Sequence, residues 1–208
     1  MQIVDGARLN WKYRNCAVIV AHPDDETLWA GGLILLHPET KWLVLSLCRG
    51  SDSERSEKFF RTMAVLGATG RMTDMDDGPD QKPLADDTVR NAILNLAGGN
   101  NFDLIVTHGT NGEYTRHRRH EEVAQAVTGL RKDSQLLCGD LWQFCYEDGG
   151  GSYLPQPGDN CDLKLLLSEQ VWQKKFDIIT LVYGFSPDSF EAETVQREEG
   201  FTFCNRCS

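Results

Sequence analysis

Long hydrophobic runs are missing from this sequence of 208 residues. No stretch approaches the roughly 18 consecutive apolar residues that mark a membrane-spanning helix. The N-terminal MQIVDGARLNWKYRN also has no continuous apolar core of a secretion signal. We therefore expect no membrane span and a cytoplasmic location.

Positive charge is also scarce. The chain has 21 Lys and Arg against 31 Asp and Glu, a formal net charge of -10, which disfavours long-range attraction to nucleic acid or to an anionic membrane. Repeats and low-complexity tracts are absent, and 40% hydrophobic with 25% charged residues is typical of a globular protein. We expect one domain over residues 1–208 with its core in about 16–145, and the sequence leaves homo-oligomer formation open.

The cysteines form no regular framework, because their number is odd at seven. Two lie in apolar runs and three are scattered along the chain: Cys16, Cys48, Cys138, Cys145 and Cys161. We expect these five to be reduced, as in a cytosolic protein. The terminal pair Cys204 and Cys207 has metal-binding or redox spacing, but no second pair matches it, so we expect no functional role there.

Apolar runs alternate with helix-like segments. Runs that predict strands are 16–21, 42–48, a weak 72–75, 104–107, 136–144 and 163–167. Segments that predict helices are 27–36, 53–66, 86–96, 117–130 and 169–176. Ser53 is a predicted N-cap, while Gly67 and Gly98 are predicted to end their helices. Repeated strand–helix units predict a mostly parallel sheet wrapped by helices, and the Gly- and Pro-rich segment 147–160 is a loop, either a flap or a connector.

Charged clusters follow three of the predicted strands, at residues 22–26, 48–52 and 107–122. The carboxyl ends of parallel strands meet at one crevice of an open sheet, where ligands bind. We therefore expect His22 and Asp25 to lie near His117 and His120.

Two imidazoles and one carboxylate make an open zinc site with a fourth position for water. His22, Asp25 and His120 supply that set. Bound Zn²⁺ would lower the pKa of its water toward about 7 and would neutralise part of the acidic cluster. Another divalent transition metal is the alternative cofactor.

Each of these residues also has an ordinary structural interpretation. A lone His at a strand end is more often structural, and Asp24 has the position of a helix N-cap. Glu26 is expected to accept hydrogen bonds behind the site. The glycine pair at 31–32 invites a dinucleotide site, but the preceding turn lacks the glycine fingerprint that pyrophosphate needs.

Two motifs together resemble a known family. AHPDDE at 21–26 and HRRH at 117–120 are similar to the signature of the PIG-L and LmbE type of N-acetylglucosaminyl deacetylases. GEY at 112–114 also resembles the family, and the similarity extends through the strand–helix order from about 17 to 127.

The resemblance implies roles for individual residues. It implies that His22, Asp25 and His120 bind zinc, that Asp24 is the general base, and that His117 stabilises the oxyanion or donates a proton. The sequence departs from the family just before the HxxH, where two residues in place of one separate Tyr114 from His117.

Candidate substrate contacts are Tyr114, Arg49 and Arg118. Arg118 belongs to the densest basic run of an acidic chain, together with Arg116 and Arg119. Because arginine binds phosphate or carboxylate through two parallel hydrogen bonds, we hypothesise that an anionic N-acetyl sugar is preferred. The alternative is that these arginines pair with acids of the same segment, namely Glu113, Glu121 and Glu122.

We therefore predict a single-domain α/β protein with a Rossmann-like, mostly parallel sheet and helices on both faces. The predicted function is zinc-dependent removal of the N-acetyl group from an N-acetylglucosamine-type conjugate, a small-molecule partner. The alternatives are a metal-dependent amidohydrolase of a non-sugar amide and a metal-binding module without turnover. The intact base Asp24 favours an enzyme.

Overall fold

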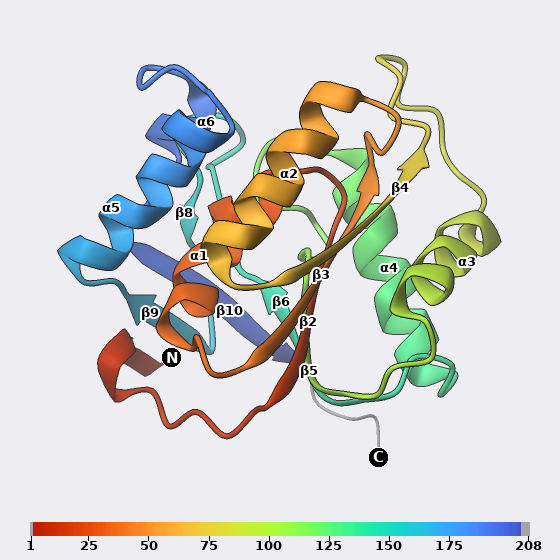
Figure 1. Ribbon diagram of the computed structural model, residues 1–208, viewed down its shortest axis with the longest axis horizontal. Coiled ribbons are helices and arrows are strands. Elements are labelled where there is room, and N and C mark those ends of the chain that lie inside the picture. The colour runs from red at the N-terminus through yellow and green to blue at the C-terminus, as the bar shows by residue number, and fades with distance from the viewer. Residues whose placement is uncertain (1, 205–208) are drawn as a thin grey trace.

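The computed structural model describes residues 2–204, and its centre is an eight-stranded sheet with the strand order β1-β9-β10-β6-β5-β2-β3-β4 (Figure 1). The strands of this sheet are β1 (Gln2–Asp5), β2 (Asn15–Val20), β3 (Lys41–Cys48), β4 (Thr69–Met75), β5 (Phe102–Thr107), β6 (Cys138–Phe144), β9 (Leu163–Leu166) and β10 (Glu198–Cys204). The helices are α1 (Asp25–Leu36), α2 (Ser53–Leu66), α3 (Asp86–Ala97), α4 (Arg118–Lys132), α5 (Glu169–Asp177) and α6 (Phe190–Glu193), with a 3₁₀ turn η1 (Gly6–Arg8) and a π-helix η2 (Ile178–Val182).

The central strands are parallel and buried on both faces. β2 pairs with β3 on one side and with β5 on the other, so that Val18 lies between Val44 and Val106. All five residues of β2 after Asn15 are buried, which explains why its sequence is a continuous apolar run and does not alternate. β4 and β6 extend the parallel set, whereas β10 runs antiparallel to both of its neighbours. The prediction of a mostly parallel sheet is confirmed.

Helices cover both faces of the sheet, as predicted (Figure 1). On one face α1, α2 and η2 pack against even-numbered β2 residues such as Val18, and Trp29 of α1 is fully buried there. On the other face α3 and α4 pack against odd-numbered ones such as Ile19. Because side chains of a strand alternate between faces, β2 contributes side chains to the hydrophobic cores on both faces of the sheet.

Most predicted elements are present, with corrections at their ends. The cap of α2 is Asp52, whose side chain accepts a hydrogen bond from the Arg55 amide, and not Ser53. Gly67 and Gly98 end α2 and α3 in the left-handed conformation, with φ of 68° and 62°, as predicted. In the eight-stranded sheet, the two strands that the sequence did not predict are β1 and β10, and both belong to the half beyond β6.

The cysteine prediction is wrong for one pair. Cys145 and Cys161 form a disulfide, with their Cα atoms 5.6 Å apart. The disulfide closes residues 146–160, in which β7 (Tyr146–Glu147) pairs with β8 (Gln156–Pro157). The disulfide and this strand pair together stabilise the segment 147–160 as a connector between β6 and β9. Cys16, Cys48 and Cys204 are free thiols, whereas Cys207 lies outside the described residues.

The glycine pair in α1 has a packing role. Glu199 of β10 is fully buried, forms an ion pair with Lys175 (2.8 Å), and accepts hydrogen bonds from the amides of Gly32 and Leu33. A Cβ atom on Gly32 would lie 2.9 Å from the Glu199 carboxylate and 2.5 Å from Leu167. Glycine therefore allows β10 to approach α1.

In residues 2–204 no helix is both long and apolar enough to cross a bilayer.

Candidate functional site

The site lies where β2 and β5 end side by side, at the point where the strand order changes direction. From β2 the chain proceeds to β3 on one side, and β5 begins the other side of the parallel set. This is the position at which open α/β sheets bind ligands. The amide of Ala21, just after β2, donates to Nε2 of His108, just after β5 (2.9 Å), and thereby joins the two strand ends.

Three ligand atoms converge at this point. Nδ1 of His22 lies 3.2 Å from Oδ2 of Asp25 and 3.3 Å from Nε2 of His120, and the last two atoms are 3.4 Å apart. Ligands of a tetrahedral ion bound at about 2.0 to 2.1 Å are separated by about 3.3 to 3.4 Å. The sequence motifs after β2 and at the start of α4 therefore meet in a triangle of the size that a zinc-like ion requires.

Carboxylates lie behind both imidazoles. Oε2 of Glu113, which is 1% exposed, lies 2.6 Å from Nδ1 of His120 and 2.9 Å from Nδ1 of His108. Oδ1 of Asp77 lies 3.2 Å from Nε2 of His22. Carboxylates in this position fix the orientation of metal-binding histidines and increase their basicity.

The charges of this cluster favour a cation. Burial by itself would raise the pKa of Asp25, but His120 and His108 outweigh burial and hold it well below its usual value. Burial likewise opposes protonation of His120, but Asp25 and Glu113 raise its pKa to about 9. The buried carboxylates thus hold positive charge on the imidazoles, and a divalent cation can replace those protons. The donor set therefore fits a metal ion in geometry and in charge.

Asp24 lies beside the triangle and has a different partner. It occupies the N-cap position of α1, but its side chain makes no capping hydrogen bond and its φ is 109°. Its Oδ2 lies 3.1 Å from Nη1 of Arg55. Burial and the neighbouring Asp25 raise the pKa of Asp24 well above its usual value, although Arg55 opposes the rise. A carboxyl group with a raised pKa and a strained backbone is typical of a functional position.

His117 faces the same point from the start of α4. Its ring stacks on that of His120, with centroids 4.4 Å apart, and its Nδ1 is buried without a hydrogen-bond partner among the described residues. Burial, followed by the proximity of His120 and His22, lowers the pKa of His117 to about 4. His117 is therefore neutral near pH 7, and one of its ring nitrogens has no hydrogen-bond partner among the described residues.

Glu26 is fully buried behind this group. Its carboxylate accepts hydrogen bonds from the hydroxyls of Thr27 (2.6 Å) and Tyr183 (2.8 Å) and from the Asp24 amide (3.1 Å). Burial raises the pKa of Glu26 to about 7. Glu26 is thus the hydrogen-bond acceptor that the sequence led us to expect, and it supports the backbone that carries Asp24.

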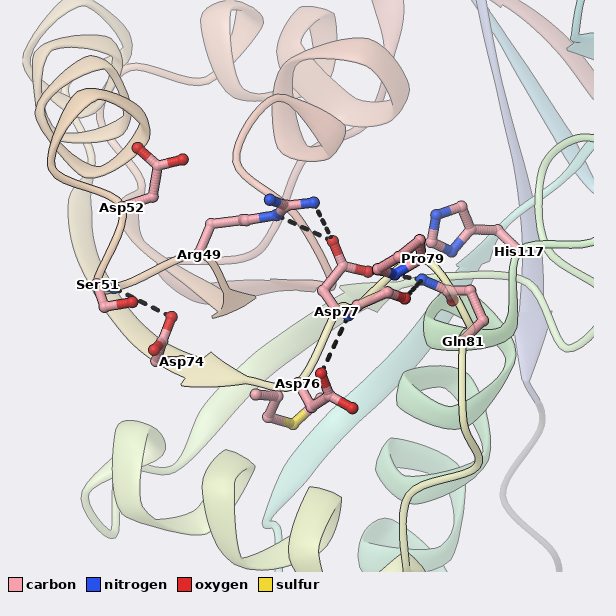
Figure 2. A pocket seen from close by; sticks show the side chains of 11 residues that line it. Arg49, Ser51, Asp52, Asp74, Asp76, Asp77, Pro79, Gln81 and His117 are labelled. Atoms are coloured by element: carbon pink, nitrogen blue, oxygen red, sulfur yellow. Dashed lines mark hydrogen bonds and ion pairs between the residues drawn. The ribbon is translucent and has the colours of Figure 1, made fainter.

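The triangle opens into a cavity of about 190 Å³. The cavity is lined by His22, Pro23, Asp24, Asp25, Leu28, Arg49, Arg55, Asp77, Tyr114, His117, Phe190 and Glu191. A wider hollow of about 630 Å³ lies beside it (Figure 2). Arg49, Asp77 and His117 border both spaces, and Figure 2 shows the Arg49 guanidinium directed at the Asp77 carboxylate.

The predicted substrate arginines differ in their surroundings. Arg49 lines the cavity but is already paired with Asp77, with Nη2 to Oδ2 at 2.7 Å. Arg118 is exposed and does not line the cavity. Arg55 also lines the cavity and pairs with Asp24. Because both arginines of the cavity are paired with carboxylates, the geometry gives no support to a preference for anionic substrates.

The other two arginines of the basic run pair within their own segment. Arg116 pairs with Glu121 at 2.8 Å. Arg119 is fully buried, pairs with Glu122, and donates to the carbonyl of Asp76 (2.6 Å). Arg119 thereby fastens the loop that carries Asp77. The alternative of internal pairing therefore holds for these two arginines, but the third expected acid, Glu113, serves the histidines.

Several residues of the site were missed or assigned another role in the sequence analysis. Glu113 was considered only as part of GEY and as a partner of the arginines, although an acid between His108 and His117 was a signal for its role. Asp77 follows the weakest predicted strand, and Arg55 lies on the first turn of α2, so neither had a local signal. Phe190 and Glu191 come from α6, in the part of the chain that has no motif.

Comparisons with known proteins bear on the family and the fold of this chain. The family described as PIG-L, GlcNAc-PI de-N-acetylase, matches residues 17–130, a segment that includes the triangle, Asp24, His117 and Glu113. Protein L374 of Acanthamoeba polyphaga mimivirus is 23% identical in an alignment of 146 positions that covers 62% of this chain. The chain spans 61% of the length of that viral protein.

Solved structures share the fold at low sequence identity. The N,N'-diacetylchitobiose deacetylase of Pyrococcus horikoshii superimposes with a TM-score of 0.71 at 12% identity, covering 93% of this chain and 84% of that one. The 4-carboxy-2-hydroxymuconate hydratase GalB of Pseudomonas putida gives 0.70 at 16% identity, with 94% and 98% covered. A teicoplanin deacetylase gives 0.63 at 13% identity, with 82% and 84% covered. The fold thus occurs with more than one kind of reaction, and function has to be argued from the site.

Proposed function

Because the chain belongs to the PIG-L family of GlcNAc-PI de-N-acetylases, we propose that it is a metal-dependent N-deacetylase. The proposed reaction hydrolyses the acetamide of an N-acetylglucosamine-type sugar conjugate to acetate and a free amine. The observation that carries the proposal is the triangle of ligand atoms from His22, Asp25 and His120, with sides of 3.2 to 3.4 Å. Asp24 and His117 line the same cavity.

His22, Asp25 and His120 are the residues that would hold the metal. Two imidazoles and a carboxylate suit Zn²⁺, and another divalent transition metal is the alternative. When bound, such an ion supplies Lewis-acid chemistry, because it acidifies water and polarises a carbonyl oxygen.

Asp24 is the proposed general base. It would take a proton from the water whose oxygen attacks the carbonyl carbon of the amide. A raised pKa suits a carboxylate that must accept a proton near neutral pH, and burial raises the pKa of Asp24. Arg55, 3.1 Å away, would hold the carboxylate in place. When the C–N bond breaks, the proton on Asp24 can pass to the leaving amine.

His117 is proposed to stabilise the oxygen that becomes negative during the attack. Its lowered pKa of about 4 makes it a neutral imidazole near pH 7, so it would act through an N–H hydrogen bond. The unpartnered Nδ1 supports this role. Tyr114 and Arg49 also line the cavity and are proposed substrate contacts.

Product analysis tests the proposed reaction. Metal-loaded protein is incubated with N-acetylglucosamine, N,N'-diacetylchitobiose and N-acetylated amino acids, and acetate and primary amine are measured in the same sample. We expect equal amounts of acetate and amine from the sugars, and about 10² to 10⁴-fold less from Asp24→Asn protein. Release from amino acids alone would favour the non-sugar amidohydrolase. Release from no substrate by metal-loaded protein would favour the binding module.

A further inference from the structure

One wall of the cavity is built by the C-terminal part of the chain, which lies outside the matched segment 17–130 in the sequence. Phe190 and Glu191 of the short helix α6 form this wall. The helix is held firmly in place: the Ser189 hydroxyl accepts a hydrogen bond from the Ala192 amide (3.2 Å), and Ala192 is 2% exposed in the core. The N-cap and the buried Ala192 therefore fix the position of the backbone that carries Phe190 and Glu191.

Phe190 is the centre of an exposed apolar rim. Its side chain is 42% exposed, and its ring contacts that of Tyr114, with centroids 5.3 Å apart at 63°. On the far side of Phe190 a groove continues over Tyr153 and Leu154, which are 43% and 38% exposed. A contiguous exposed apolar patch beside a polar cavity is typical of a ligand-binding surface.

Glu191 adds an unused acceptor to the same wall. It lines the cavity, and its carboxylate makes no hydrogen bond or ion pair with any residue of the described part of the chain. The other acids of the cavity are engaged, since Asp24 pairs with Arg55 and Asp77 pairs with Arg49. Glu191 is therefore free to accept hydrogen bonds from a ligand.

From this arrangement we infer that Phe190 and Glu191 select the sugar ring of the substrate. A pyranose has an apolar face of C–H groups, which fits against an aromatic ring, and an edge of hydroxyl groups, which fits a carboxylate acceptor. Phe190 and Glu191 offer these two surfaces side by side at the mouth of the cavity. This inference rests on the proposed function and extends it, because it assigns the choice of sugar over a simple amide to α6.

The test compares a sugar with an acetamide that has no ring. The kcat and KM values are measured for N-acetylglucosamine and N-acetylethanolamine, and the ratio of the two kcat/KM values is the sugar preference. We expect Phe190→Ala and Glu191→Gln each to lower this preference by about 10-fold, through the KM for the sugar. Phe190→Ala removes an apolar contact that only the ring makes, and Glu191→Gln replaces a charged acceptor of the ring hydroxyls with a weaker neutral one. Phe190→Tyr keeps the ring and should restore the preference.

Matched controls separate the wall from general effects. Glu193→Gln changes an exposed acid on the same helix, and Leu181→Ala removes a side chain that is 76% exposed elsewhere. Both should keep the wild-type preference. If Phe190→Ala or Glu191→Gln also keeps it, or lowers only kcat, that residue does not select the ring and the inference is overturned for it.

Binding keeps the two proposals distinguishable. Calorimetric titration with glucosamine measures ring recognition without turnover. If wild-type protein releases no acetate but binds glucosamine, and the two variants bind it about 10-fold more weakly, the proposed function fails and the wall is supported. If wild-type protein does not bind glucosamine, or if the variants bind it as well as the wild type does, the inference about Phe190 and Glu191 is overturned, whether or not the protein releases acetate.

Discussion

At the scale of single residues, the acidic cluster after β2 is tolerated because each of its three carboxylates has a separate partner. Asp25 faces the imidazoles, with His22 Nδ1 at 3.2 Å. Asp24 pairs with Arg55, and Glu26 accepts from Tyr183. A buried carboxylate without such partners would be neutral or would destabilise the fold. One local segment thus supplies a candidate ligand, a candidate base and a structural acceptor.

The sequence alone could predict which residue types meet but not every partner. His22 and His120 were predictable neighbours because both follow ends of parallel strands. Arg55 and Asp77 were not, because their distance from the site depends on how α2 and the loop after β4 are placed. Glu113 was partly predictable, because it lies only a few residues before HRRH in the sequence. Its contact with two imidazoles was not predictable, because that contact depends on the turn that buries Glu113.

Glu113 gives a prediction at this scale. Glu113→Gln removes the charge behind His120 but keeps the size of the side chain. Because carboxylates behind metal-binding histidines typically contribute 10 to 100-fold in affinity, we expect Zn²⁺ to bind about 10 to 100-fold more weakly. Titration of metal-free protein against a competing chelator measures this change.

The control is Glu121→Gln, an acid of α4 that pairs with the exposed Arg116 instead. It should bind Zn²⁺ as the wild type does. Thermal unfolding of the metal-free variants shows whether the fold is intact. Equal affinities of folded Glu113→Gln and wild-type protein would contradict the role of Glu113.

At the scale of secondary-structure elements, apolar runs and end signals predicted the central units well. β3 is buried over seven of its eight residues, so its sequence is as apolar as a doubly covered strand must be. Gly67 and Gly98 marked helix ends because only glycine enters the left-handed region without cost. The cap of α2 was misplaced by one residue, since Asp52 and Ser53 both have side chains that can cap.

The end of α1 gives a prediction on pH dependence. His37, its C-cap, stacks on Trp11 with centroids 3.9 Å apart at 6°, and its Nε2 is buried without a partner in residues 2–204. Burial lowers the pKa of His37 to about 4. The unfolded chain, with a pKa near 6.5, binds the proton more readily. The stability that His37 contributes is therefore complete above pH 6.5 and is lost as the pH falls toward 4.

His37→Phe keeps the stacked ring but cannot be protonated. Between pH 7 and pH 4.5 we expect the free energy of unfolding to fall by about 1 to 2 kcal/mol more in the wild type than in the variant, after a discount for the partial exposure of His37. Chemical denaturation at several pH values measures the difference. Parallel pH curves for the two proteins would show that His37 does not couple folding to protons.

At the scale of the whole molecule, the half of the sheet from β2 to β6 was predictable, whereas in the other half the sequence predicted β9 as a strand but not its partners. Strands β2 to β6 follow one another with helices between them, so local patterns define both the units and their direction. β1, β9 and β10 pair across distant parts of the chain, for example Gln2 with Leu163, and no local signal specifies such pairing. The wall at α6 lies between α5 and β10, in a stretch for which the sequence predicted no element. The site therefore combines a predictable centre with an unpredictable rim.

We propose that one turn after β2 separates metal binding, by Asp25, from proton transfer, by Asp24. Asp24→Asn and Asp25→Asn are neighbouring and equally conservative changes, so a single experiment can compare the two roles. Bound metal per chain and the rate of acetate release from N-acetylglucosamine are measured for each variant and for the wild type. We expect Asp24→Asn to keep about one metal ion per chain and to lose 10² to 10⁴-fold in rate, and Asp25→Asn to lose the metal. Equal metal content and equal rates in the two variants would contradict the claim.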